Sequence, residues 1–143
     1  MIYDKDKIQK EFLKNFVQRN RIERSYFELS SPSKRSRFSD RLNHNWESVL
    51  DMRLLTQIDK KLDNSKSIQE KLGIKDDELC YVISNYIDSD DQLLPFKEIF
   101  PMIYSRGLGA LLINISVDTL YLDTEQVFGA PPRFIGKKRD TIF

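Results

Sequence analysis

The first half of the chain carries apolar side chains at the spacing of α-helices. Over residues 6–17 the apolar positions recur every three to four residues, and Lys and Glu side chains fill the opposite face. A second helical pattern covers residues 22–29. The apolar positions of these two stretches are Ile8, Phe12, Leu13, Phe16, Val17, Ile22, Tyr26, Phe27 and Leu29. Both stretches are therefore predicted to be amphipathic helices.

A third helical pattern begins after Ser30. Ser31 is a favourable N-cap and Pro32 a favourable first helical residue. Apolar side chains at helical spacing follow, and we expect the helix to continue, or to restart, as far as residue 58. Whether residues 32–60 form one helix or two stays open at this point. A shorter helix is predicted at 68–72, ended by Gly73 as a C-cap.

The second half of the chain changes to the period of β-strands. Residues 79–84 are predicted to form a strand, residues 111–116 and 119–123 a hairpin, and residues 133–137 a last strand at a sheet edge. A short helix is predicted between them, from Leu94 and Pro95 to Ile103, although Pro101 is unfavourable inside it.

This order of elements predicts an α+β fold. We expect a helical N-terminal half packed on one face of a small antiparallel sheet of about four strands, which the C-terminal half supplies. Residues 1–75 would be mainly helical, and residues 76–138 would be mainly strands with one short helix. A length of 143 residues fits one domain, 1–143, that can bury a core without disulfides.

Composition narrows the class of protein. The single cysteine, Cys80, cannot form an internal disulfide or complete a zinc site alone, and it reads as a small buried apolar residue. We expect no metal and no cofactor. The charged N-terminus has no signal-peptide pattern, and no apolar run could span a membrane. These features predict a reducing, cytoplasmic location.

Charge is distributed unevenly along the chain. Residues 1–53 carry 12 Lys and Arg against 8 Asp and Glu (net +4), residues 54–130 carry 7 against 13 (net −6), and residues 131–143 carry 4 against 1 (net +3). Two basic ends therefore flank an acidic middle. Such asymmetry indicates a charged partner more than the overall charge of +1 does.

The most unusual local feature is a basic helix start. The first turn of a helix favours Asp and Glu, yet cations occupy the start of the predicted helix after Pro32. Positions 34, 37, 41 and 44 would form one stripe, and Trp46 lies one turn further on. The candidate binding residues, for a partner protein or an anion, are Lys34, Arg35, Arg37, Arg41, His44 and Trp46.

Three functions are compatible with this pattern. The first is a non-enzymatic protein–protein interaction module that binds another, possibly acidic, protein, because no catalytic constellation is present. The second is nucleic-acid or phosphate binding by the basic helix 32–46, with Trp46 stacking on a base. The third is a small enzyme using His44, the only histidine. An ordinary solvated helix face is the alternative to all three.

Two stretches of the chain resemble a family of small uncharacterised bacterial proteins. Residues 29–38 read LSSPSKRSRF and are followed by RLNH at 41–44, while residues 104–109 read YSRGLG. The resemblance implies a bacterial, cytoplasmic protein. Because the family has no assigned activity, it implies no site residues. The small size, the segregated charge and the lack of a catalytic constellation suggest an accessory, immunity-type or defence-type protein.

Overall fold

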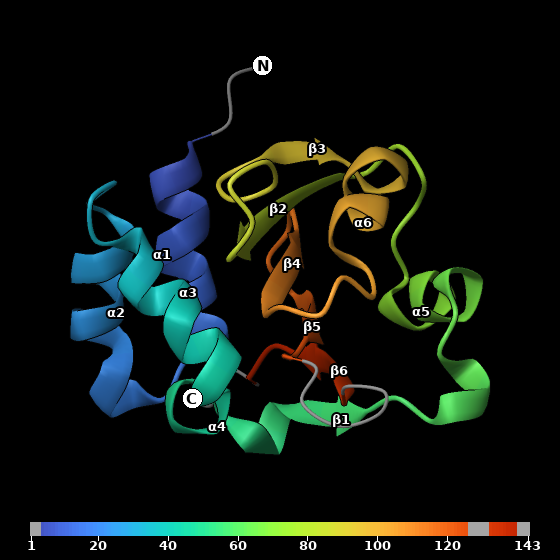
Figure 1. The fold of residues 1–143 in the computed structure, drawn as a ribbon, viewed down its shortest axis with the longest axis horizontal. Helices are drawn as coiled ribbons and strands as arrows, with labels where there is room; N and C mark the ends of the chain where they lie inside the picture. The colour runs from blue at the N-terminus through green and yellow to red at the C-terminus, as the bar shows by residue number, and fades with distance from the viewer. Residues whose placement is uncertain (1–3, 126–131, 140–143) are drawn as a thin grey trace.

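A six-stranded antiparallel sheet forms the centre of the molecule. The computed structural model describes residues 4–125 and 132–139 (Figure 1). The strand order is β1-β6-β5-β4-β2-β3, and every neighbouring pair is antiparallel. The strands are β1 (Leu55–Gln57), β2 (Leu79–Ser84), β3 (Leu93–Pro95), β4 (Ala110–Asn114), β5 (Thr119–Asp123) and β6 (Arg133–Lys137).

The α+β class is confirmed, but the predicted number of about four strands is wrong. The four expected strands are present. β1 and β3 were missed because each has only three residues, too few to show a period of two. The predicted edge position of β6 is also wrong, since β1 pairs with its outer side. β1 itself comes from a segment that was predicted to be helical.

Helices cover both faces of this sheet rather than one (Figure 1). The first four pack on one face, and α5 and α6 pack on the other. The helices are α1 (Lys5–Phe16), α2 (Ile22–Leu29), α3 (Arg35–His44), α4 (Trp46–Val49), α5 (Ser65–Leu72) and α6 (Phe96–Ile103). Three short 3-10 helices are η1 (Arg19–Arg21), η2 (Met52–Leu54) and η3 (Lys60–Leu62). The expectation that the whole helical half shares one face is therefore wrong for α5.

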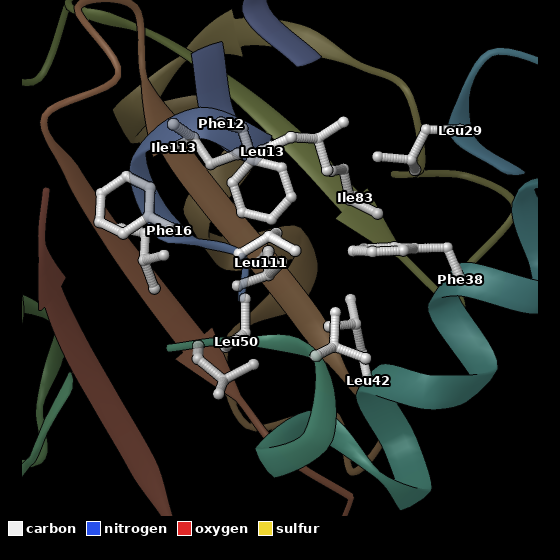
Figure 2. Close-up of a cluster of buried hydrophobic side chains, with 14 of the residues drawn as sticks. Phe12, Leu13, Phe16, Leu29, Phe38, Leu42, Leu50, Ile83, Leu111 and Ile113 are labelled. Atoms are coloured by element: carbon white, nitrogen blue, oxygen red, sulfur yellow. The ribbon is translucent and has the colours of Figure 1, made fainter. Parts of the chain in front are cut away.

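The apolar side chains of the central strands explain this double cover. In β2, Tyr81 and Ile83 point toward α1–α4, while Cys80 and Val82 point toward α5 and α6. Figure 2 shows the first core, in which Phe12 of α1 and Phe38 of α3 meet edge to face with ring centroids 6.1 Å apart. Each face thus needs its own apolar helical layer.

The region between α3 and β1 does not form one long helix. α3 ends at His44, the short helix α4 ends at Val49, and Leu50 is extended and bridges Val17. The chain then enters η2 and β1. Two α-helices and the 3-10 helix η2 therefore occupy residues 32–60, and neither α-helix continues to residue 58. Within the described ranges, no helix has the length and apolar character needed to cross a bilayer.

Gly136 lies where β6 passes closely between its two neighbours. A Cβ atom at this position would lie 2.9 Å from Leu120 Cγ in β5 and 2.9 Å from Leu55 Cδ2 in β1. Both contacts are closer than packed side chains tolerate, and the two leucines belong to the same core. Glycine is therefore required by space at this point of the sheet.

We predict that Gly136→Ala lowers the free energy of unfolding by about 1–3 kcal/mol through overpacking. Urea denaturation monitored by circular dichroism measures the change. The neighbouring Lys137→Ala, at an exposed position, is the control and should stay within about 0.5 kcal/mol of the wild type. Equal stability of Gly136→Ala and Lys137→Ala would contradict the close approach.

Asp51 ties three separate segments together at the end of α4. Its backbone N–H donates to Phe16 O at 2.8 Å, and its carboxylate contacts Arg53 at 2.8 Å and Arg139 at 3.5 Å. Hydrogen bonds from Arg53, opposed by desolvation and assisted by both positive charges, lower the pKa of Asp51 to about 2. The ionised carboxylate therefore stabilises the folded state.

This shift predicts a pH dependence of stability. A depressed pKa contributes stabilisation that is complete above the unfolded pKa, near 4, and is lost as the pH falls toward about 2. The difference in unfolding free energy between wild type and Asp51→Asn should shrink by about 1–2 kcal/mol between these pH values, after allowance for the solvent exposure of Arg53. Urea titrations at several pH values measure it. A constant difference would show that Asp51 is not stabilised as an anion.

Candidate functional site

α3 begins three residues after the predicted start at Pro32. The N–H groups of Lys34 and Arg35 donate to Ser31 O at 2.9 and 3.1 Å, so Ser31 closes a turn through its carbonyl rather than capping a helix with its side chain. Lys34 takes the N-cap position, and its side chain makes no capping hydrogen bond. The cations therefore lie at the helix start, as predicted, but Ser31 and Pro32 lie outside the helix.

Arg35 points inward and is paired within the molecule. Its Nε and Nη2 each donate to the carboxylate of Asp90 at 2.9 Å, and its Nη1 donates to Leu29 O at 3.2 Å. Burial disfavours the charged guanidinium, but the hydrogen bonds to Asp90 and the surrounding negative charges outweigh it and raise the pKa of Arg35. Arg35 thus joins α3 to the turn between β2 and β3.

Arg41 is also paired within the molecule, on the other side of α3. Its guanidinium donates through both Nη atoms to the carboxylate of Glu28 in α2. The Glu28 side chain is only 1% exposed, and the more distant Arg24 Nε lies 3.8 Å from it. Arg41 is therefore the principal counter-ion of a buried carboxylate, and it joins α3 to α2.

His44 lies on the exposed side of α3 two turns beyond Arg37, whereas Trp46 lies in α4 and turns toward the fold. The Trp46 ring packs on Phe134 of β6 with centroids 4.7 Å apart, so one side of the indole is used inside the fold. His44 is exposed, and its Nδ1 lies 3.1 Å from Glu125 Oε2. Cys80 packs in the opposite core, where burial raises the pKa of its thiol to about 12, so the sheet separates it from His44.

Two of the six predicted residues, Lys34 and Arg37, keep their positive charges available. Within residues 4–125 and 132–139 neither makes an ion pair, and Arg37 is exposed. Lys34 Nζ lies 4.0 Å from the ring centroid of Phe27, which α2 leaves 54% exposed. Phe27, Lys34 and Arg37 together are called the α2–α3 face below.

Phe27 was missed as a candidate although the sequence carried a signal for it. Ile22, Tyr26 and Leu29 follow a spacing of four and three, and all three pack on the core. Phe27 lies about 100° around the helix from Tyr26, so it cannot share that buried stripe. A large aromatic residue outside the apolar stripe of an amphipathic helix is therefore predicted to be exposed.

A second exposed apolar side chain lies across α3. Ile87 is 98% exposed in the β2–β3 turn, and this turn lines a hollow of about 240 Å³ together with Pro32, Ser36 and Ser39. Cations from α1, from α3 and from the loop after α6 hold the turn. The ion pairs are Arg35 with Asp90, Arg106 with Asp88, and Lys5 with Asp91. These ion pairs brace the turn against α1, α3 and the loop that follows α6.

The described residues contain no group of three or more His, Cys, Asp or Glu that could hold a metal ion. Arg35 and Arg41 hold α3 between the two elements that carry Ile87 and Phe27. The α2–α3 face is therefore a small exposed surface on which the Phe27 ring lies beside the positive charges of Lys34 and Arg37.

We predict very different effects on the free energy of unfolding for substitutions of Arg35 and Arg37, which are only two positions apart. Arg35→Met removes the main counter-ion of Asp90, which is half-buried. We therefore expect the free energy of unfolding to fall by about 3 kcal/mol. Arg37→Met removes an exposed charge and should change stability by no more than about 0.5 kcal/mol. Guanidinium denaturation measures both. Similar losses in the two variants would contradict the assignment of Arg35 to the interior and Arg37 to the surface.

Comparison of the chain with protein-family models, with curated proteins and with solved structures found no match in any of the three. The resemblance of residues 29–44 and 104–109 to small bacterial proteins therefore stays a prediction. The site is defined here by geometry alone.

Proposed function

We propose that this chain is a non-enzymatic interaction module that binds an acidic partner protein through the α2–α3 face. In the setting that the sequence suggests, it would be an accessory or immunity-type protein of the bacterial cytoplasm. The observation that carries the proposal is the exposed Phe27 ring beside Lys34 and Arg37, two cations without an ion-pair partner among the described residues.

The physical chemistry of this face favours a protein partner. Aromatic and Arg side chains are enriched among residues that dominate binding energy, and an exposed ring gains most when a partner removes it from water. α2 and α3 are held together by the buried Arg41–Glu28 pair, so the ring and the cations are presented on fixed elements. Little conformational entropy is then lost on binding.

Nucleic-acid binding by residues 32–46 is the weaker alternative. Arg35 and Arg41 are already neutralised by Asp90 and Glu28, which reduces the charge available for phosphates. Trp46, the expected stacking residue, packs on Phe134. Two free cations make a small footprint for a polyanion, and no specific observation favours a second function.

The test is affinity capture from the native host with three variants. Lys34→Glu with Arg37→Glu reverses the charge of the face, Phe27→Ser removes the ring, and Asp77→Lys is a charge-changing control at an exposed position between α5 and β2. A partner recovered with wild type and Asp77→Lys is purified, and its affinity for each variant is measured by isothermal titration calorimetry. We expect at least about a tenfold loss for the first two variants.

Nuclease treatment distinguishes the alternatives. A partner that survives nuclease and depends on Phe27 supports the proposal. Nucleic acid recovered by wild type and lost with the charge-reversed variant would replace it with the phosphate-binding alternative. Equal capture by all variants would show that the α2–α3 face is an ordinary solvated surface.

A further inference from the structure

Ile87 is the most exposed large apolar side chain in the described part of the chain, at 98%. Its backbone is nevertheless held on both sides by one arginine. Arg106 Cζ lies 4.1 Å from the ring centroid of Tyr86, and Arg106 Nη1 lies 3.3 Å from Asp88 Oδ2. The hydroxyl of Tyr86 also accepts the N–H of Leu108 at 2.7 Å. Ile87 is therefore presented to solvent on a braced turn.

The bracing, more than the exposure, makes Ile87 unusual. Single apolar side chains are common on protein surfaces and need no explanation. A turn that is held by ion pairs, however, has already lost the conformational freedom that binding would otherwise remove. Because the Ile87 side chain buries almost nothing within the fold, this order brings it no packing. An apolar side chain on a preorganised turn is a favourable anchor for a partner.

Ile87 adjoins the α2–α3 face through the hollow beside α3. Pro32, in the segment that joins α2 to α3, and Ser36, in the first turn of α3, line this hollow together with Ile87. Lys34 lies between Pro32 and Ser36 in the sequence and belongs to the α2–α3 face. The α2–α3 face and the Ile87 turn therefore lie on the two sides of the start of α3.

The size of protein interfaces requires a partner to extend beyond the α2–α3 face. A specific interface uses about 20–30 residues of each protein, and its core contains apolar anchors. Four exposed large apolar side chains are found among the described residues. Met52 in η2 and Leu62 in η3 lie near β1, whereas Ile87 borders the hollow at the start of α3. An interface that extends across α3 gains Ile87 as its second anchor after Phe27.

The charges of the turn permit an acidic partner to approach it. Unpaired carboxylates beside Ile87 would repel such a partner, but each is paired with a cation of the same molecule. The pairs are Asp88 with Arg106, Asp90 with Arg35, and Asp91 with Lys5. The positive charges of the α2–α3 face remain available. A complementary partner is therefore acidic where it meets this face and apolar where it meets Ile87.

We infer that the acidic partner protein crosses the start of α3 and encloses Ile87 in an apolar pocket. The inference rests on the proposed function, because it extends the same interface. Phe27 and Ile87 are the apolar anchors at its two ends, and Lys34 and Arg37 lie beside the first of them. The bracing of the β2–β3 turn then has a consequence for binding, since it fixes the direction of Ile87 before the partner arrives.

Isothermal titration calorimetry with the purified partner tests the second anchor. Ile87→Ser should weaken binding at least about tenfold, because it removes the side chain that fills the pocket. Leu62→Ser is the matched control, since it truncates an apolar side chain that is 39% exposed in η3, and it should leave the affinity unchanged. Urea denaturation should show the same stability for Ile87→Ser and wild type, because the Ile87 side chain is almost fully exposed.

Comparison of Ile87→Ser with Phe27→Ser separates the two proposals. Weaker binding by both variants supports the extended interface. Weaker binding by Phe27→Ser alone overturns the present inference and leaves the proposed function in place. Affinities equal to that of wild type for both variants, or the recovery of no partner from the host, would overturn both proposals.

A photo-cross-linker on α3 tests the path of the partner. The amino acid p-benzoylphenylalanine replaces Asp40, which is exposed and lies about one turn beyond Ser36. Irradiation in host cells should join this position to the partner, and the same probe in place of Asp77 should give no adduct. Adding Ile87→Ser should reduce the adduct. The lack of an adduct at position 40, or an equal yield with Ile87→Ser, would contradict a partner that crosses α3 to reach Ile87.

Discussion

The central strands of this protein bury side chains on both of their faces, and the rest of the architecture depends on that constraint. Tyr81 and Ile83 of β2 lie in one core while Cys80 and Val82 lie in the other, and β4 alternates in the same way. Leaving either face bare would expose a continuous apolar surface to water. One group of helices must therefore cover each face, and α3 belongs to the group that also builds the candidate site.

Packing α2 and α3 onto the sheet brings carboxylates into places with little solvent. Glu28 is almost fully buried, and Asp90 is half-buried beside the start of α3. A buried carboxylate without a counter-ion is costly, so each is held by an arginine of α3. These two ion pairs fix the helix between Phe27 and the Ile87 turn. The cations along α3 and at its N-cap therefore divide into an internal pair, Arg35 and Arg41, and an outward pair, Lys34 and Arg37.

The sequence was sufficient for the α+β class, for the long strands and for most helices, because apolar spacing is a local signal. β1 and β3 are too short to carry that signal. The double cover could have been recognised from LCYVIS and ALLIN, since nearly unbroken apolar runs indicate strands buried on both faces. The division of the basic residues into inward and outward pairs could not have been recognised from the sequence. Its decisive partners, Glu28 and Asp90, lie 13 and 55 residues away along the chain, and only the tertiary fold brings them to Arg41 and Arg35.

The arginines of α3 act as internal counter-ions and thereby shape the surface around them. The coupling between Arg41 and Glu28 is measured by a double-mutant cycle with Glu28→Gln, Arg41→Met and the double variant, using unfolding free energies from urea denaturation. We expect each single variant to lose about 2–4 kcal/mol and the double variant to lose less than their sum by at least about 1 kcal/mol. Additive losses would show that the two side chains act independently, and would contradict the account.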